Sequence, residues 1–303
     1  MMTIPSEWAH AVDGTYRTAR LIIFKLINCC RERVMTEEIL FEIEDEIGIL
    51  TFNRPQVMNA FGDNTRPLLL KLLTEAETND AIGCVILTGA GKAFAAGGDI
   101  KSMQEQQGNK DTATISARME TAGQVVSLIR SMSKPVIAAV NGAAAGAAVN
   151  LALACDLRYA SSKAFFVQSF VKIGLMPDWG GHYYLPRVVG TAKALELFML
   201  GDRIDAETAA QYGLVNEVFP AESFLARVKE KARLLADAPR NTIAAIKECT
   251  YFAMHHDLQD TLRKEQAMQA DLFLSENAQE GMRAFLEKRP PSFNRTEKIN
   301  PDD

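Results

Sequence analysis

Two stretches of the chain decide its fold: Lys92-Ala93-Phe94-Ala95-Ala96-Gly97-Gly98-Asp99-Ile100 and Val140-Asn141-Gly142-Ala143-Ala144-Ala145-Gly146-Ala147. Both are associated with apolar runs that predict β-strands, at residues 84–88 and 136–140. Small residues that follow a strand let a ligand approach the backbone closely, because little side chain stands in the way. The two stretches therefore predict two turns whose backbone N–H groups are open to a ligand.

Length and composition restrict the class of protein. A chain of 303 residues with 48% hydrophobic residues can form one large domain, or one domain with a helical appendage. The net charge of -5 argues against a nucleic-acid partner. No apolar run reaches the roughly 18 residues of a membrane span. The cysteines show no CxxC spacing, so we expect reduced thiols in a cytoplasmic protein and no metal site; they are Cys29, Cys30, Cys84, Cys155 and Cys249.

The pattern along the chain predicts an α/β protein. Residues 39–44 and 47–52 read as two short strands joined by a turn, and Asp63 is expected to cap a helix that runs to Glu77. Further strands are predicted at 84–88, 136–140, 156–160 and 165–167, with a helix at about 114–131. Strands that alternate with helices indicate a parallel or mixed sheet.

The two ends of the chain read differently. Residues 192–286 show mostly helical patterns, with boundaries near Asp205, Pro220, Pro239 and Asn277. The polar tail 290–303 contains Pro-Pro and is expected to be disordered. Residues 1–34 are an N-terminal extension of unknown role, whose basic and apolar residues fit an amphipathic helix or a targeting segment. An upstream start codon, or an extension specific to the family, before Met35 would explain these residues equally well.

A helix that opens at about Gly146 leaves its first N–H groups without partners, and its dipole adds partial positive charge there. A Gly/Ala segment alone also serves close helix–sheet packing. Together, however, the two stretches closely resemble the crotonase (enoyl-CoA hydratase/isomerase) superfamily, from about Met35 to Phe293. The resemblance implies a spiral of ββα units over 35–225 and a helical trimerisation region over 226–289. It also implies that the N–H groups of Gly98 and Ala147 form an oxyanion hole for a thioester.

The catalytic carboxylates indicate which reaction the chain has kept. Hydratases of this superfamily use two Glu residues, and here Asn150 and Phe170 stand in those positions. Neither exchanges a proton as Glu does. Asp178 stands where double-bond isomerases carry an Asp, and an apolar pocket of Trp179, Phe170 and Met176 would raise its pKa. We therefore expect an enoyl-CoA isomerase of fatty acid metabolism with one Asp base.

Other functions remain open at this point. A Pro-Asp-x-Gly-Gly string also suits a turn or a helix cap, and Asp99 is expected to order its loop or cap a helix. Hydratase-like activity, a dehalogenase or hydrolase using the same Asp, and a non-catalytic acyl-CoA binding protein are the alternatives. A dehalogenase of this kind needs a supporting His in the first wall of the pocket, and the sequence has no His between Asp63 and Ser133. The Gly89-Ala90-Gly91-Lys92 string lacks P-loop spacing.

The resemblance also implies the ligand and the assembly. Coenzyme A enters as part of the thioester substrate, so no separate cofactor is expected. The apolar helical faces after residue 224 imply a homotrimer or hexamer. Substrate contacts are expected from basic residues for the phosphates, from the loop along the adenine, from the acyl pocket and from the terminal helix of a neighbouring subunit: Arg54, Val57, Ala60, Lys92, Ala96, Lys101, Asn150, Phe170, Trp179, Phe285 and Lys288.

Overall fold

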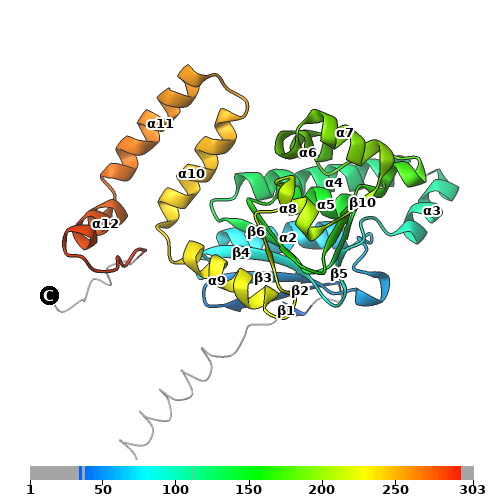
Figure 1. Ribbon diagram of the computed structural model, residues 1–303, viewed down its shortest axis with the longest axis horizontal. Helices are drawn as coiled ribbons and strands as arrows, with labels where there is room; N and C mark the ends of the chain where they lie inside the picture. Colours follow the sequence, from blue (N-terminus) through cyan, green and yellow to red (C-terminus); the bar gives the residue numbers. More distant parts are fainter. Residues whose placement is uncertain (1–33, 36–37, 111, 295–303) are drawn as a thin grey trace, which may run out of the picture. The chain divides into compact units, whose positions relative to one another are not determined.

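The computed structural model describes residues 34–35, 38–110 and 112–294 (Figure 1). Contacts divide the chain into Met1–Arg33 and Val34–Asp303, and everything below concerns the second unit. The prediction of an N-terminal extension falls almost wholly outside the described residues. Within those residues, no helix is long and apolar enough to cross a membrane.

The larger sheet has seven strands in the order β1-β2-β3-β4-β6-β8-β11. β1 and the β2–β3 hairpin are antiparallel, and the pairs from β3 onward are parallel. The hairpin turns at Asp45 and Glu46, both in the left-handed region, which two-residue hairpin turns require. The strands are β1 (Val34–Met35), β2 (Ile39–Glu44), β3 (Ile47–Phe52), β4 (Cys84–Gly89), β6 (Val136–Val140), β8 (Leu157–Ser161) and β11 (Glu217–Phe219).

A smaller sheet carries the sequence stretches that decide the fold. It has four strands in the order β10-β9-β7-β5. They are β5 (Ala93–Ala95), β7 (Ala143–Ala145), β9 (Phe165–Val167) and β10 (Arg203–Asp205). β5, β7 and β9 are parallel, so their carboxyl ends meet at one edge of the sheet. The expected α/β spiral is thereby confirmed.

Helices cover both faces of the larger sheet. α2 (Thr65–Thr78), α4 (Thr112–Ser131) and α5 (Ala147–Ala154) form one core with it, and α9 (Phe224–Ala236) forms a second core on the other face. Alternate residues of β4, such as Val85 and Ile86, belong to different cores. A parallel sheet that is buried on both faces needs such continuous apolar strands.

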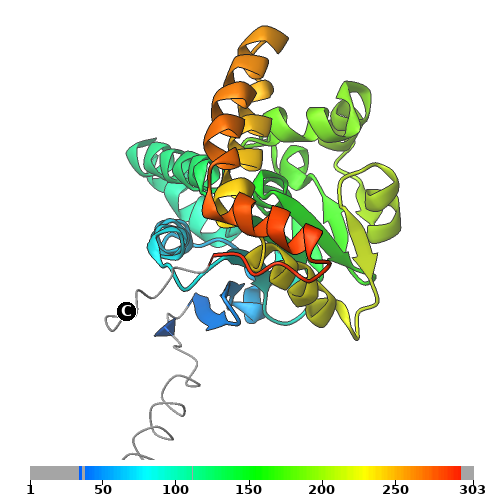
Figure 2. The ribbon, with the colours of Figure 1, turned by 90° about the vertical axis from the view of Figure 1, so that its left-hand side faces the viewer.

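The remaining short helices surround the smaller sheet and the loops (Figure 1). They are η2 (Pro55–Val57), α3 (Ile100–Asn109), η3 (Ser169–Ile173), α6 (Gly181–Val189), α7 (Thr191–Leu200) and α8 (Ala206–Gln211). α10 (Arg240–Ala253), α11 (Leu258–Phe273) and α12 (Glu276–Leu286) form the C-terminal arm. Figure 2 shows α11 packed alongside α10.

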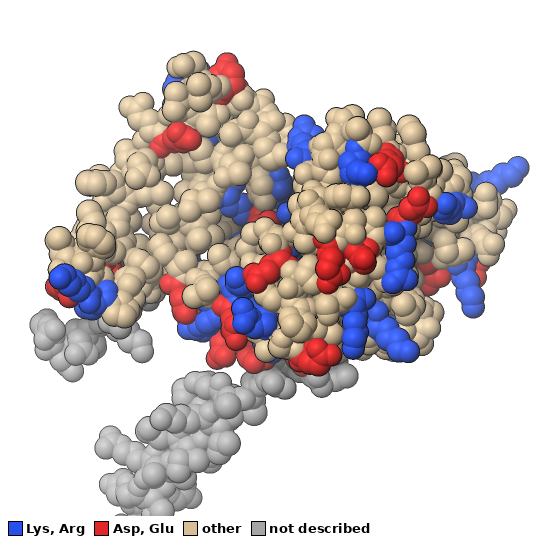
Figure 3. All heavy atoms as spheres, viewed as in Figure 1, with Lys and Arg blue, Asp and Glu red and all other residues tan. Residues whose placement is uncertain are grey.

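A buried polar cluster anchors the C-terminal arm to the core. Lys247 of α10 is almost fully buried and donates to Asp156 (2.8 Å) and to the carbonyl oxygens of Ile129 (2.7 Å) and Lys134 (3.0 Å). The Tyr251 hydroxyl bonds to the other oxygen of Asp156. Beyond this anchor the arm has little cover: α11 has no buried side chain. Figure 3 shows few charged side chains on the visible face of α10 and α11.

The structure differs in detail from three expectations about local structure. Asn64, not Asp63, stands at the N-cap of α2, because the Asp63 carboxylate pairs with Arg118 and accepts from Ser102 instead. The stretch 192–286 contains the short strands β10 and β11, whose three residues give too little periodicity to be seen. Residues 290–294 of the tail are ordered, because Asn294 bonds to the backbone of Ala238 and Arg240, whereas the rest of the tail, 295–303, lies outside the described residues.

Candidate active site

The first turn follows β5 and runs through Ala96, Gly97 and Gly98. It is pinned to the neighbouring loop: Ala96 N–H donates to the Met58 carbonyl (2.9 Å), Phe61 N–H to the Gly97 carbonyl (2.7 Å) and Asp99 N–H to the Phe61 carbonyl (3.2 Å). Gly97 has a φ of +84°, which favours glycine. These bonds leave the Gly98 N–H pointing away from Phe61, and no acceptor for it occurs among the residues the structure describes.

Asp99 closes this turn. Its side chain accepts from the Lys101 N–H and so caps α3, as predicted. It also pairs with Arg54 at 3.1 Å, and Arg54 donates to the Ala60 carbonyl at 2.8 Å. The Arg54 guanidinium therefore holds two loops together, and its predicted contact with a phosphate is not supported by this geometry.

The second turn follows β7. Gly146 has φ +51° and ψ −120°, a conformation that side chains disfavour, and its N–H donates to the Val167 carbonyl at 2.8 Å. α5 begins at the next residue, so the Ala147 N–H is the first of a helix and has no acceptor within the described chain. The predicted helix start at Gly146 is confirmed. Such an N–H carries partial positive charge from the helix dipole.

The two turns lie directly beside each other. A Cβ atom on Gly97 would lie 2.7 Å from the Ala145 carbonyl oxygen and 3.4 Å from the Ala147 nitrogen. The parallel pairing of Ala95 with Ala144 produces this contact. Two free N–H donors from adjacent turns can hold one oxygen atom that becomes negatively charged.

Asp178 lies in the loop between η3 and α6. Asn150, in the first half of α5, donates its Nδ2 to the Asp178 carbonyl at 2.8 Å, and Gln168 Nε2 donates to Asn150 Oδ1 at 2.7 Å. The loop is thus fixed to the helix whose N-terminus forms the second turn. The Asp178 Oδ1 atom is buried without a donor among the described residues. Burial raises the pKa of this carboxyl to about 6, and the nearby Arg66 cation acts in the opposite direction.

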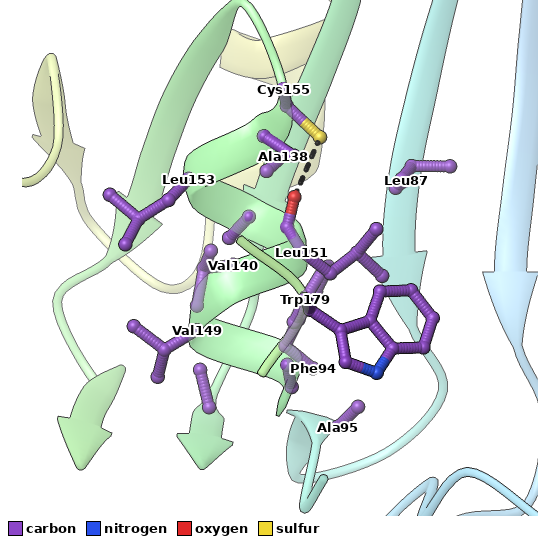
Figure 4. Close-up of a cluster of buried hydrophobic side chains, with 14 of the residues drawn as sticks. Leu87, Phe94, Ala95, Ala138, Val140, Val149, Leu151, Leu153, Cys155 and Trp179 are labelled. Carbon is purple, nitrogen blue, oxygen red and sulfur yellow. Dashed lines mark hydrogen bonds between the residues drawn. The ribbon is translucent and has the colours of Figure 1, made fainter. Parts of the chain in front are cut away.

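Aromatic side chains line this region. Trp179 is 4% exposed and adopts a φ of +49°; its ring packs on Phe61 at 5.4 Å between centroids. Figure 4 shows the indole among the apolar side chains beside α5. Phe170 is also buried, and its ring would lie 3.5 Å from a Cβ on Gly146. Met176 is 74% exposed, so it does not complete the apolar pocket predicted for Asp178.

Asn150 does not have the predicted role of a substrate contact. Its side chain is fully buried, and both its oxygen and its nitrogen bond to protein groups. It packs so closely that a Cβ on Gly181 would lie 2.5 Å from Asn150 Nδ2. Asn150 instead positions the backbone that carries Asp178.

The other predicted contacts fall into two groups. One group lies at the first turn. Ala96 belongs to this turn, and its N–H bonds to Met58 in the loop that contains Val57 and Ala60. Lys92 and Lys101 are exposed near the turn. Phe285 lies at the end of α12 and Lys288 follows that helix, and α12 lies apart from both turns within one chain (Figure 1). Phe285 is 84% exposed.

Sequence reasoning missed Arg66. This residue lies in the first turn of α2, is 4% exposed and donates to the Gly62 carbonyl at 3.1 Å. Its charge lowers the pKa of Asp178, and burial lowers the pKa of Arg66 itself. The sequence did contain a signal that Arg66 is buried. Its spacing puts it on the same helix face as Leu69 and Leu73, and both leucines are core residues.

The described residues hold no cluster of three or more His, Cys, Asp or Glu side chains that suits a metal ion. The chemistry-bearing groups brought together are two backbone N–H donors, one buried carboxyl and one buried guanidinium. The two donors can bind a carbonyl oxygen, and the carboxyl can take up and release a proton.

Comparison with known proteins identifies the family of this chain. The family model described as enoyl-CoA hydratase/isomerase matches residues 42–296. The chain is 39% identical to a "probable enoyl-CoA hydratase" of Rhodobacter capsulatus over 84% of this chain and 97% of that protein. It is 37% identical to the 1,2-epoxyphenylacetyl-CoA isomerase of Escherichia coli over 86% of this chain and 99% of that protein.

A solved structure shows the same fold. An enoyl-CoA hydratase from Polaromonas sp. JS666 superposes with a TM-score of 0.81 at 37% identity, and covers 84% of this chain and 99% of that one. The matched region includes both turns, Asp178 and the C-terminal arm up to residue 296. The fold, the paired turns and these relatives together establish that the chain belongs to the enoyl-CoA hydratase/isomerase family, within the crotonase superfamily.

Proposed function

We propose that this family member is an acyl-CoA double-bond isomerase in which Asp178 is the single acid–base group. The observation that carries the proposal is the state of Asp178: a buried carboxyl with one unpaired oxygen and a pKa of about 6. Its loop is tied to α5, at whose start the Ala147 N–H lies. A base with a pKa near the working pH transfers protons efficiently in both directions.

The proposed reaction needs only one such group. The thioester oxygen accepts hydrogen bonds from the N–H groups of Gly98 and Ala147, which together act as the oxyanion hole. The Asp178 carboxylate removes a proton from the carbon between the thioester and the double bond, and the resulting dienolate is held by these donors. Protonated Asp178 then returns the proton two carbons further along, and the double bond becomes conjugated. No cofactor takes part, because coenzyme A belongs to the substrate.

Hydration is less well supported than isomerisation. Adding water across a conjugated enoyl thioester needs one group to activate water and another to protonate carbon. Asn150 is fully occupied by protein hydrogen bonds, and Phe170 carries no titratable group. Asp178 is the carboxyl that remains for this work.

We propose that the exposed side chains of Lys92 and Lys101 bind the phosphate groups of coenzyme A. We also expect the protein to be located in the cytoplasm.

Replacing Asp178 with Asn tests the base. The amide keeps the shape but accepts no proton, so isomerisation should fall about 10²-fold or more. The assay follows the absorbance of the conjugated enoyl thioester formed from a β,γ-unsaturated acyl-CoA. Asp202→Asn, at an exposed carboxylate, is the matched control and should keep the wild-type rate. Equal rates for both variants would remove Asp178 from the chemistry. A wild type that binds the thioester without turnover would favour a binding protein.

The pH dependence of the rate should report the same carboxyl. Because the pKa of Asp178 is raised to about 6, the active carboxylate form predominates above that pH and is lost below it. kcat/KM for isomerisation should therefore be flat in the neutral range and fall about tenfold per pH unit below about 6. An inflection at an ordinary carboxyl value near 4 would contradict the assignment.

Ala147 allows the second donor to be removed by itself. Proline is tolerated at the first position of a helix and has no N–H, so Ala147→Pro should lower kcat by about 10²–10³. Ala147→Gly keeps the N–H and is expected to retain activity within severalfold. Thermal melting should show both variants folded. Similar activity in the two would mean that this N–H does not hold the thioester oxygen.

We further propose that the C-terminal arm mediates assembly into a homotrimer or hexamer. Large apolar side chains remain exposed along α11 and α12: Leu258 is 68%, Phe273 is 60% and Phe285 is 84% exposed. A partner subunit on this face would cover them and bring Phe285 and Lys288 toward a neighbouring coenzyme site.

Light scattering tests this assembly. The purified chain should have three or six times its mass of 33.4 kDa, and Phe273→Asp should shift the population to smaller species, because a charge would be buried in the contact. Ser162→Asp, at an exposed position of the turn between β8 and β9, adds the same single negative charge and is the control. A wild-type monomer at micromolar concentration would exclude the proposal.

A further inference from the structure

Unpaired buried polar atoms gather around the candidate site. Among the described residues, Arg66 Nε, Trp179 Nε1 and Asp178 Oδ1 are buried side-chain atoms without a hydrogen-bond partner, as are Arg118 Nε and Gln168 Oε1 nearby. Buried polar groups are otherwise almost always paired, because each unpaired one costs free energy. Two further such atoms, Glu77 Oε2 and Arg240 Nε, belong to residues outside the site. A ligand bound in the site would complete the hydrogen bonds of Arg66 and Trp179.

Arg66 Nε and Trp179 Nε1 are both donors, and both residues contact Phe61. Arg66 donates through Nη1 to the carbonyl oxygens of Gly62 (3.1 Å) and Phe61 (3.5 Å), while the Phe61 ring packs on Trp179. Arg66 and Trp179 are each 4% exposed, so neither donor can reach bulk solvent freely. Figure 4 shows the indole nitrogen on the ring edge turned toward Ala95, the last residue before the first turn.

Of these two donors, Arg66 is the more unusual because it is a buried cation without a carboxylate partner. Within the described part of the chain no carboxylate lies within ion-pair distance of its guanidinium, whereas the nearby Arg118 pairs with Asp63. Asp178 acts on Arg66 only through its more distant field, and Arg118 repels it. A hydrocarbon chain placed here would leave a buried cation and an indole N–H unpaired, which is costly.

We propose that the acyl pocket is built for an acyl group that carries a hydrogen-bond-acceptor oxygen, which accepts from Arg66 and Trp179. The proposal rests on the proposed function, since it takes the thioester to lie against Gly98 and Ala147. It goes further by naming the substrate class: oxygen-substituted acyl-CoA thioesters rather than plain fatty acyl ones. Neither Arg66 Nε nor Trp179 Nε1 bonds to Asp178 Oδ1, so a substrate oxygen can accept from both donors while the carboxylate stays free to act as the base.

Binding of unreactive saturated thioesters tests the proposal without any turnover. Isothermal titration would compare hexanoyl-CoA, the thioester of the same length with a terminal hydroxyl in place of the methyl group, and glutaryl-CoA, with shorter and longer members of each series. At its best chain length, an oxygenated thioester should bind the wild type about tenfold more tightly than the plain one, the gain of pairing a buried donor. Comparing the hydroxylated thioesters with the carboxylated ones shows whether the site prefers a neutral or an anionic oxygen.

Variants connect the preference to the two donors. Arg66→Met should abolish the preference while hexanoyl-CoA still binds, which also shows that the variant is folded. Trp179→Phe keeps the ring packing on Phe61 and should weaken the preference severalfold. Arg227→Met, at an exposed arginine of α9, is the matched control and should keep it.

Two results would overturn the proposal. One is equal or weaker binding of both oxygenated series by the wild type at every chain length; the other is a preference that survives in both Arg66→Met and Trp179→Phe. The first would mean that these donors do not bind an acyl oxygen, and the second that another group recognises it. Neither result would affect the Asp178 assignment, which the isomerisation assay tests separately.

Discussion

The parallel pairing of three very short strands is the constraint on which the site depends. β5, β7 and β9 have three residues each and are joined in register through Ala93 with Ala143 and Ala143 with Phe165. The fit leaves no room for larger groups: a Cβ on Gly142 would lie 2.1 Å from the Lys92 carbonyl oxygen. Because all three strands run in one direction, the turns after them open at one edge. The free N–H groups lie there, and Asn150 bonds the Asp178 loop to α5, the helix that begins at Ala147.

Side-chain amides hold these loops where regular hydrogen bonding ends. Asn59 is buried in the left-handed region, and its Nδ2 donates to the carbonyl oxygens of Ala90 (2.9 Å) and Ala93 (2.8 Å). Asn141 accepts from the Gly89 N–H at 3.0 Å and so connects the ends of β4 and β6. Asn150 does the same for the Asp178 loop. Each amide supplies a donor and an acceptor, which suits it to bridging backbone segments that form no ladder. The loops of the site are therefore held in place by bonds to each other.

The sequence predicted most of this architecture, because apolar strands and glycine-rich turns leave strong local patterns. The two turns, the start of α5, the helix cap by Asp99 and the family all followed from short-range signals. What failed depends on contacts between distant residues. Asp63 looked like a cap but is drawn to Arg118, fifty-five residues away. Asn150 looked available to substrate until its partner Gln168 and the Asp178 carbonyl were in place. Arg66 acquires its importance only from being enclosed next to Asp178.

The enclosure of Asn150 also bears on how such enzymes diverge. A Glu at this position would be longer by one methylene group, and its carboxylate would face the Asp178 carbonyl oxygen in place of a donor amide. Gly181 already packs against the amide with no space to spare. A single substitution to Glu therefore meets both repulsion and crowding, and the 174–181 loop has to be rebuilt along with it. Introducing a second carboxylate at position 150 of this chain consequently requires coupled changes in α5 and in the loop that it holds, and a single substitution there is expected to destabilise the protein.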